Sequence, residues 1–313
     1  MLSLDSRRAF PGESPRKHRF PLWQDELDAA QSWAEHGART PSKARYASSV
    51  VLLRDSPRGP KALLSYHRGY SPLGTIAFPG GSVETGDEAE IGWLGPSPAM
   101  WAKAMGMDDP RLARLHIVAA IREVFEETGV LLAGSYTSSV VEVAPSPKWD
   151  AKREALVSQD ITFQELLGKH GLSLRTDLLK PLMNWISPDF AHRRFNTRYF
   201  AAALPAHQAA SPLVSKSGWV DWLCPAHLLQ ERESTGLGDA VGAANTVGRR
   251  LDQLVSSGCQ LILSKIARSR GCIAYLNHHR PVLAFQPRLV TEDGEFWLEI
   301  DTPTSTEGVC RDR

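Results

Sequence analysis

The sequence predicts an α/β fold with a mixed sheet. Short apolar runs bounded by turn residues recur along the chain, and the first three, 47–53, 62–66 and 76–78, have the length and composition of strands. A helical pattern follows, with apolar residues three and four apart before Gly129, a residue type that commonly ends helices. Strands and helices alternate again in the second half, without an internal repeat. This order is typical of α/β proteins.

The N-terminal part of the chain differs in composition from the rest. Residues 1–43 are rich in Arg, Pro and Ser around one short amphipathic stretch, 22–33. They are predicted to form an arm that packs on the core or on a partner. The first two strands are joined by the turn-rich segment 55–60, which predicts a hairpin, and the third strand leads into a glycine turn.

The second half of the chain carries further elements. Strands are predicted at 140–143, 198–203, 281–285 and 295–300, and helices at 164–169, 226–231 and 243–256. We expect a central domain at 44–225, with a helical and strand extension at 226–313 packed on it.

Composition and charge are those of a globular protein without bulk attraction to polyanions. The chain has 313 residues, 42% of them hydrophobic, enough for one large core with appended elements. Its formal net charge is +1, so we expect no nucleic-acid or membrane partner. No apolar run reaches the ~18 residues that span a bilayer, and residues 1–8 lack the apolar stretch of a signal peptide. We expect a cytoplasmic protein with reduced cysteines and leave a homodimer open.

A cluster of carboxylates stands on the helix that ends near Gly129. At about 100° per residue, Glu123, Glu126 and Glu127 share one face, opposite an apolar stripe. Carboxylates three and four positions apart repel each other unless a positive group compensates them. Arg122 can neutralise one, and Mg²⁺ or Mn²⁺, which accept oxygen ligands, are natural partners for the others. A solvated acidic face is the alternative.

A glycine turn precedes this helix in the sequence. Residues 78–87 look like a strand end followed by a tight turn, where the backbone can approach a ligand closely. Together with 122–130 they resemble the Nudix box at 81–130: Gly, five residues and Glu, then Arg-Glu-apolar-any-Glu-Glu-any-Gly-apolar. Gly81 supplies the first glycine, Asp87 stands in place of Glu, and the second half matches at every specified position. The chain thus resembles the Nudix hydrolases, which implies an α/β/α sandwich.

An insertion interrupts the box. Between Asp87 and Arg122 lie 34 residues, 27 more than the seven of the pattern. The insertion, at about 88–114, carries Trp and Met residues that predict a small packed excursion. A split box of this kind, with the downstream segments 185–188 and 193–205, resembles the family branch of peroxisomal coenzyme A diphosphatases and their bacterial relatives.

The resemblance implies a metal-dependent diphosphatase that acts on a nucleoside diphosphate linked to another moiety, with Mg²⁺ or Mn²⁺ as cofactor. The metal ligands that it implies are Glu126, Glu127, Glu123 and the carbonyl of Gly80. Glu123 is either a ligand or the base that deprotonates the attacking water, and Arg122 orients the carboxylates by a charge-assisted contact. Glu84 and Asp87 are placed to reach a second metal.

One acidic position of related chains has no counterpart here. Many family members recruit a Glu shortly before a Trp that corresponds to Trp222, and that register falls on Lys216. Asp221 is the nearest acid, on a predicted strand. The assignment of the base and of a second metal therefore stays open.

Four arginines are predicted to bind substrate phosphates: Arg68, Arg193, Arg194 and Arg198. Coenzyme A or an acyl-coenzyme A is the substrate that the resemblance favours, and ADP-ribose or a dinucleotide is the alternative within the class. A non-catalytic Nudix-fold ligand sensor is the alternative from a different class. Such proteins commonly lose box carboxylates, whereas all three are kept here.

Overall fold

A computed structural model describes residues 16–23, 26–37, 39–68, 71 and 73–303 of the chain. Its centre is a mixed sheet in the order β11-β3-β2-β10-β9-β12, with β4 beside β3 and β5 beside β2. The strands are β2 (Arg45–Arg54), β3 (Lys61–Tyr66), β4 (Ile76–Ala77), β5 (Gly80–Ser82), β9 (Lys180–Ile186), β10 (Phe195–Ala203), β11 (Val220–Leu223) and β12 (Leu283–Phe285). β10 runs parallel to β2 and β12 parallel to β9, whereas β11 and β3, among others, are antiparallel. The predicted α/β fold with a mixed sheet is confirmed.

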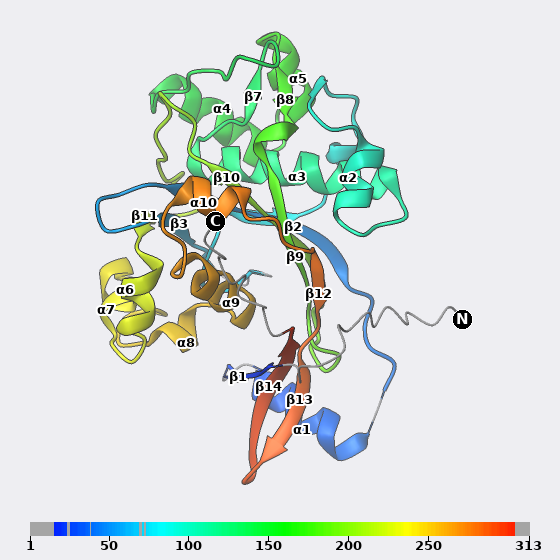
Figure 1. Cartoon of the computed structure of the whole chain (residues 1–313), viewed down its shortest axis with the longest axis vertical. Coiled ribbons are helices and arrows are strands. Elements are labelled where there is room, and N and C mark those ends of the chain that lie inside the picture. The colour runs from blue at the N-terminus through cyan, green and yellow to red at the C-terminus, as the bar shows by residue number, and fades with distance from the viewer. Residues whose placement is uncertain (1–15, 24–25, 38, 69–70, 72, 304–313) are drawn as a thin grey trace, which may run out of the picture.

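Helices cover both faces of this sheet (Figure 1). One layer holds α2 (Pro98–Ala104), α3 (Pro110–Thr128), α4 (Pro147–Val157) and α5 (Phe163–Lys169), and the other holds α8 (Leu251–Leu254), α9 (Ser257–Ile266) and α10 (Cys272–Asn277). Strand β2 shows why both faces need a cover, because its apolar side chains alternate between them. Val50 and Leu52 pack under α3, while Val51 and Leu53 pack under α9. The architecture is an α/β/α sandwich.

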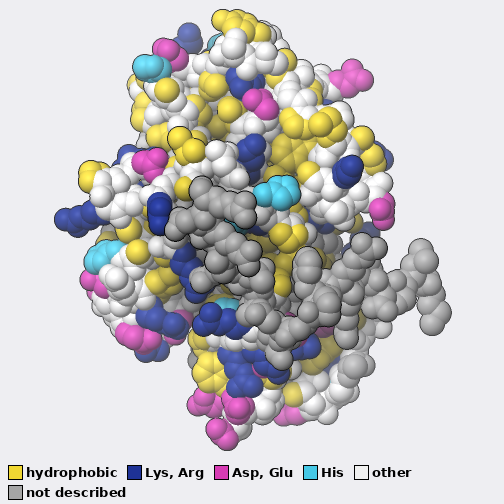
Figure 2. All heavy atoms as spheres, in the orientation of Figure 1, with side chains coloured by type: hydrophobic (Ala, Val, Ile, Leu, Met, Phe, Trp, Pro, Cys, Tyr) yellow, Lys and Arg dark blue, Asp and Glu magenta, His cyan; other side chains and the backbone are white. Residues whose placement is uncertain are grey.

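The N- and C-terminal segments meet in a separate small sheet (Figure 1). β1 (Arg16–Pro21) pairs with β14 (Glu295–Thr302), which also pairs with β13 (Arg288–Glu292), and α1 (Leu27–His36) packs on this sheet through Ala29 and Ala30. Lys and Arg side chains gather over this region on the face in Figure 2. Within the sheet, Lys17, Arg19 and Arg288 pair with Glu299. β1 together with α1 accounts for most of the described part of the predicted arm, and residues 1–15 lie outside the described residues.

The C-terminal region does more than pack on the core. It supplies α9 to the second helix layer and β12 to the edge of the central sheet, after α6 (Pro225–Gln230) and α7 (Gly236–Val241). The sandwich is therefore built partly from the segment 226–313 that the sequence analysis sets apart as an extension. No helix among the described residues is long and apolar enough to span a membrane.

The insertion in the box is packed, as its Trp and Met residues indicate. Trp101 and Met105 are buried between α2 and α3. β6 (Trp93–Leu94) joins β8 (Ser173–Arg175), which pairs with β7 (Ala133–Gly134) in a third sheet. α3 begins inside the insertion, where the Asp109 carboxylate accepts the N–H groups of the first turn. Two short 3-10 helices, η2 (Thr85–Glu88) and η3 (Thr176–Leu178), follow strands β5 and β8, respectively, in the sequence.

Two predicted elements are wrong. The segment 140–143 forms no strand, since Val141 makes a single backbone bond to Ala133 and the chain runs on irregularly. The helix predicted at 243–256 is a series of turns, with Gly248 in the left-handed region at φ +73°, followed by the single turn α8. The longer helix of this region is α9, which begins after Ser256 caps it.

Candidate active site

Two glycines set the distance between the glycine turn and the carboxylate helix. Strand β5 pairs with β2, so that Gly80 and Gly81 run between that strand and α3. A Cβ on Gly80 would lie 2.4 Å from the Ser48 carbonyl oxygen, and one on Gly81 would lie 2.4 Å from Oε1 of Glu123. A larger residue at Gly80 would clash with the backbone of β2, and one at Gly81 would push the Glu123 carboxylate out of its place. The backbone therefore lies directly against the carboxylates.

The three carboxylates of α3 are buried. Glu123 is 2%, Glu126 4% and Glu127 1% exposed, which overturns the alternative of a solvated acidic face. Buried carboxylates are retained as charged groups only where hydrogen-bond donors or cations compensate them. The contacts of each carboxylate therefore define what this site can bind.

Arg122 is the structural centre of the acidic cluster. Its Nε donates to Asp87 Oδ1 at 2.8 Å and its Nη2 to Asp87 Oδ2 at 3.1 Å, a bidentate pair. Its Nη1 donates to Glu123 Oε1 at 2.8 Å and to Glu126 Oε1 at 3.2 Å. A further bond, which Nη2 donates to the Ser82 carbonyl at 2.9 Å, links α3 to strand β5. Arg122 thus contacts Asp87, Glu123 and Glu126, and its role in orienting the carboxylates stays a prediction.

Lys216 is the second cation in the cluster. Its Nζ donates to Glu123 Oε2 at 2.7 Å and also to Oε2 of Glu126. Burial alone would raise the pKa of Glu123, yet Lys216 and Arg122 outweigh it and hold that pKa well below its usual value. Lys216 stands where related chains have an acid, so the ammonium takes a place that the resemblance assigns to a ligand.

Glu127 has a different set of partners. It accepts bonds from the Ser65 hydroxyl at 2.8 Å and from the Gly80 backbone N–H at 3.3 Å. His67 Nε2 lies 3.7 Å from Glu127 Oε2 and 3.1 Å from the Ser65 hydroxyl. Burial raises the pKa of Glu127, because these partners compensate its charge only in part.

The chemistry of the cluster suits a hard divalent cation, but its arrangement places protein cations there. Three carboxylates and a nearby backbone segment are the donors that Mg²⁺ and Mn²⁺ accept. Among the described residues, however, no three His, Cys, Asp or Glu side chains converge as metal ligands. Arg122 and Lys216 lie between Glu123 and Glu126, and Glu127 is bonded to Ser65 instead. A divalent cation must therefore displace Lys216 to bind the carboxylates of both Glu123 and Glu126.

The two residues predicted for a second metal have separate roles. Both carboxylate oxygens of Asp87 are engaged by Arg122, and Oδ2 also accepts the Glu84 N–H at 2.8 Å. Asp87 thus fixes the position of the Arg122 guanidinium, and neither of its carboxylate oxygens is left to bind a second metal. Glu84 stays at the rim, where partial burial and the charges of Glu123 and Glu126 raise its pKa.

The structure separates the four arginines predicted to bind phosphate. Arg68 is exposed and lies beside Gly218, where a Cβ would stand 2.9 Å from its Nη2, in the loop that carries Lys216. The donors of Arg194 are used on the Ser42, Ser187 and Pro188 carbonyls and on Asp189. Arg198 is half-buried, with Nη1 bonded to the Met105 carbonyl, and Arg193 is exposed near Arg194. Only Arg68 adjoins the Lys216 loop.

A buried arginine that the sequence analysis does not single out links the helix to that loop. Arg153, on α4, is 1% exposed, and its Nε donates to the Glu126 carbonyl at 3.1 Å near the C-terminus of α3. Its Nη2 donates to the Ser211 carbonyl at 3.0 Å, at the start of the segment that leads to Lys216. No local sequence pattern marks Arg153, because its partners are remote along the chain. Ser65 and His67 were missed as partners of Glu127 for the same reason.

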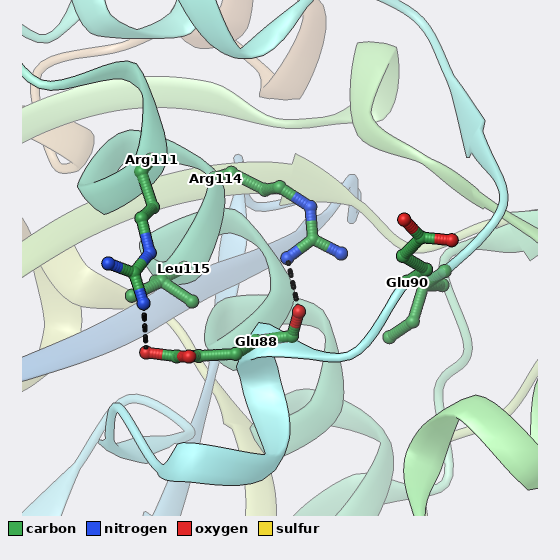
Figure 3. A pocket seen from close by; sticks show the side chains of 6 residues that line it. Glu88, Glu90, Arg111, Arg114 and Leu115 are labelled. Atoms are coloured by element: carbon green, nitrogen blue, oxygen red, sulfur yellow. Dashed lines mark hydrogen bonds and ion pairs between the residues drawn. The ribbon is translucent and has the colours of Figure 1, made fainter.

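An open pocket of about 440 Å³ adjoins the site on the side of the insertion (Figure 3). Its lining residues are Glu88, Glu90, Ile91, Arg111, Arg114 and Leu115. Arg111 pairs with Glu88 at 2.8 Å, and Arg114 Nη1 donates to the Asp87 carbonyl at 3.0 Å. The pocket thus lies behind Asp87, whose carboxylate faces Arg122. Its two arginines already have partners, so we assign it no catalytic role.

Comparison with solved structures identifies the fold of the chain. No protein-family model and no curated protein matches the chain. Among solved structures, a NUDIX hydrolase from Alicyclobacillus acidocaldarius is 19% identical and superposes over 78% of this chain and 99% of its own, with a TM-score of 0.56. The NUDIX domain of Shewanella oneidensis NrtR complexed with ADP ribose is 14% identical over 64% of this chain and 86% of its own, with a TM-score of 0.32. A C. elegans Ap4A hydrolase is 14% identical over 64% and 93%, with a TM-score of 0.31. The first of these likenesses shows that the chain has the Nudix fold.

Proposed function

We propose that this chain is a Nudix hydrolase that cleaves the diphosphate bond of a nucleoside diphosphate linked to another moiety. The observation that carries the proposal is the burial of three carboxylates at one end of α3, beside Gly80 and Gly81 of strand β5. Burying three carboxylates within about one helical turn is costly, so a site of this kind is retained for what it binds. Their spacing is that of the Nudix box, and the fold is the Nudix fold.

We assign the cofactor role to Mg²⁺ or Mn²⁺, held by Glu126, Glu127 and Glu123 with the Gly80 carbonyl. Such a cation, when bound, stabilises charge on the phosphoryl oxygens and orients water. The protein's own part is to hold these carboxylates in place, through Arg122 on Glu123 and Glu126 and through Ser65 on Glu127. Because Arg122 and Lys216 lower the pKa of Glu123, it is better suited to be a ligand than a base.

The finer proposal concerns the substrate. Coenzyme A carries a 3′-phosphate that ADP-ribose lacks, and this group needs a cation outside the carboxylate site. Arg68 supports that role because it is exposed and adjoins the loop of Lys216. Of the other three predicted arginines, Arg194 and Arg198 are bonded to backbone carbonyls, and Arg193 lies next to Arg194, away from the Lys216 loop. We therefore assign the 3′-phosphate contact to Arg68, and ADP-ribose and dinucleotides are the competing substrates.

A non-catalytic ligand sensor is the second candidate, and Lys216 is the observation that favours it. With the Lys216 ammonium between Glu123 and Glu126, this site resembles one in which a protein cation has replaced the metal ion. The retention of all three box carboxylates favours the enzyme. A sensor would bind a nucleotide without consuming it, so turnover separates the two functions.

The test is a substrate panel with product analysis. Purified protein with Mg²⁺ or Mn²⁺ is incubated with coenzyme A, its 3′-dephospho form, ADP-ribose and a dinucleoside polyphosphate, and products are identified by mass. The proposal predicts cleavage within the diphosphate, which for coenzyme A gives 3′,5′-ADP and a 4′-phosphopantetheine product. Faster cleavage of ADP-ribose than of coenzyme A would reject the coenzyme A assignment alone. Binding of these compounds without turnover of any would favour the sensor.

A further inference from the structure

We propose that Lys216 is a built-in competitor for the metal site, so that its ammonium and a divalent cation occupy the carboxylates of α3 in turn. The inference rests on the proposed metal dependence and adds a residue that controls it. Lys216 Nζ donates to Oε2 of both Glu123 and Glu126, while the Oε1 atoms of these carboxylates face Arg122. All four oxygens of the pair therefore have a protein cation as partner.

The position of the ammonium is set by the loop that carries it. The Lys216 and Ser217 N–H groups both donate to the Leu213 carbonyl, at 3.1 and 2.7 Å, and form a tight turn. Leu213 and Ser217 are buried, and the Ser217 hydroxyl donates to the Trp219 carbonyl at 3.1 Å. Ser215, next to Lys216, donates to Glu154 on α4. A turn held on both sides directs this side chain to the carboxylates.

The ammonium can nevertheless leave without disrupting the fold. The Lys216 side chain is 26% exposed, whereas Arg122 is 8% exposed and has Asp87 as a second anchor. A lysine has four rotatable bonds and a strongly hydrated head group, so moving into solvent restores its hydration. Of the two cations that contact Glu123, Lys216 is therefore the one that a metal displaces.

Simultaneous occupancy is excluded by distance and charge. Divalent cations bind carboxylate oxygens at about 2.0–2.6 Å, and the ammonium already lies 2.7 Å from Glu123 Oε2. A metal on the same oxygens would stand next to the ammonium, with like charges in a largely buried site. Lys216 must withdraw first, so the apparent metal affinity is lowered by the free energy of its contacts. Lys216 also stabilises the metal-free fold.

The experiment measures metal binding rather than turnover. Mn²⁺ is titrated calorimetrically into wild-type protein, Lys216→Gln and Lys216→Glu in the absence of substrate. Removing the competitor is expected to tighten Mn²⁺ binding by at least about tenfold in Lys216→Gln, and at least as much in Lys216→Glu, which adds a carboxylate. Lys169→Gln, an exposed lysine on α5, controls for net charge, and Ser215→Ala controls for loosening of the loop. Both controls should bind as wild type does.

Thermal unfolding gives a second, independent result. In EDTA, Lys216→Gln should melt below wild type, because Glu123 and Glu126 lose a compensating charge. In saturating Mn²⁺ the difference should shrink or reverse, so the metal-induced shift is larger in the variant. If the variant folds only with Mn²⁺, its affinity is measured by competition with a chelator. Equal Mn²⁺ affinities in wild type and both Lys216 variants would overturn the inference, whereas wild-type failure to hydrolyse any diphosphate would reject only the proposed function.

Discussion

Replacing Arg122 by Met tests whether this side chain holds the acidic cluster together. Arg122 is 6% exposed and donates twice to Asp87, once each to Glu123 and Glu126, and once to the Ser82 carbonyl. Met keeps most of the apolar volume and removes every donor. Among the described residues, the Glu84 N–H would then be the remaining donor to the buried Asp87 carboxylate. Breaking a buried ion pair from one side costs about 3–5 kcal/mol, a large part of the ~5–15 kcal/mol stability of a typical domain.

The assay is urea unfolding in EDTA, followed by tryptophan fluorescence, for Arg122→Met, Asp87→Asn and the double variant. Because Asp87→Asn removes the charge that Arg122→Met strands, the double variant should lose less stability than the sum of the single losses, by at least about 1 kcal/mol. Arg111→Met is the matched control, since Arg111 pairs with Glu88 at the surface and its loss should cost at most ~1 kcal/mol. Additive losses within about 0.5 kcal/mol would refute the reasoning.

The remaining predictions concern turnover, substrate binding and pH. Glu126→Gln and Glu127→Gln should each lower turnover at least about 100-fold with a cooperative unfolding transition retained, and near wild-type rates in both would contradict the metal assignment. Arg68→Ala should raise KM for coenzyme A about tenfold or more and change little for the 3′-dephospho form; equal effects would refute the 3′-phosphate contact. Burial lowers the pKa of His116 from 6.5 to about 3, so below the unfolded value only the unfolded chain takes up the proton. The free energy of unfolding should therefore decrease as the pH is lowered below 6.5, by about 2 kcal/mol at pH 5. His116→Asn should make the free energy of unfolding depend less on pH in urea unfolding, and an unchanged dependence would contradict the prediction.

The helix of the site was predictable because its signals are local. Glu123, Glu126 and Glu127 lie within about one helical turn, and Gly129 ends the helix at φ +74° with its N–H bonded to the Phe125 carbonyl. The strands β2 and β3 were predictable for the same reason, since a turn-rich segment joins two apolar runs. Periodicity and turn chemistry of this kind need no knowledge of the rest of the chain.

The partners of the carboxylates were not predictable from such signals. Lys216 lies 93 residues from Glu123 and 90 from Glu126, and only the fold brings its loop to α3. The comparison with related chains did single out this position, but as a missing acid. It gave no indication that the lysine would point at the carboxylates. Arg153 likewise reaches Glu126 and Ser211 from another helix.

The second helix layer shows a limit of periodicity itself. The prediction placed a helix at 243–256, whereas the chain turns at Gly248 and the long helix is α9. Ser256 decides the boundary, because its hydroxyl accepts the Cys259 N–H and starts the helix there. Gly258, an unfavourable residue inside a helix, is required because a Cβ would stand 2.9 Å from the Trp185 ring. Tertiary packing thus overrides local propensity.

The central claim is that the carboxylates of α3 direct water onto a diphosphate. The most direct measurement is hydrolysis of the preferred diphosphate substrate in heavy-oxygen water, with wild type and Glu127→Gln compared under saturating Mg²⁺ or Mn²⁺. The account predicts one labelled oxygen in a phosphate group of one product from wild type, and a rate at least about 100-fold lower in Glu127→Gln. Tight binding of the diphosphate by wild type without any labelled product, or equal rates of labelling in both proteins, would contradict the account.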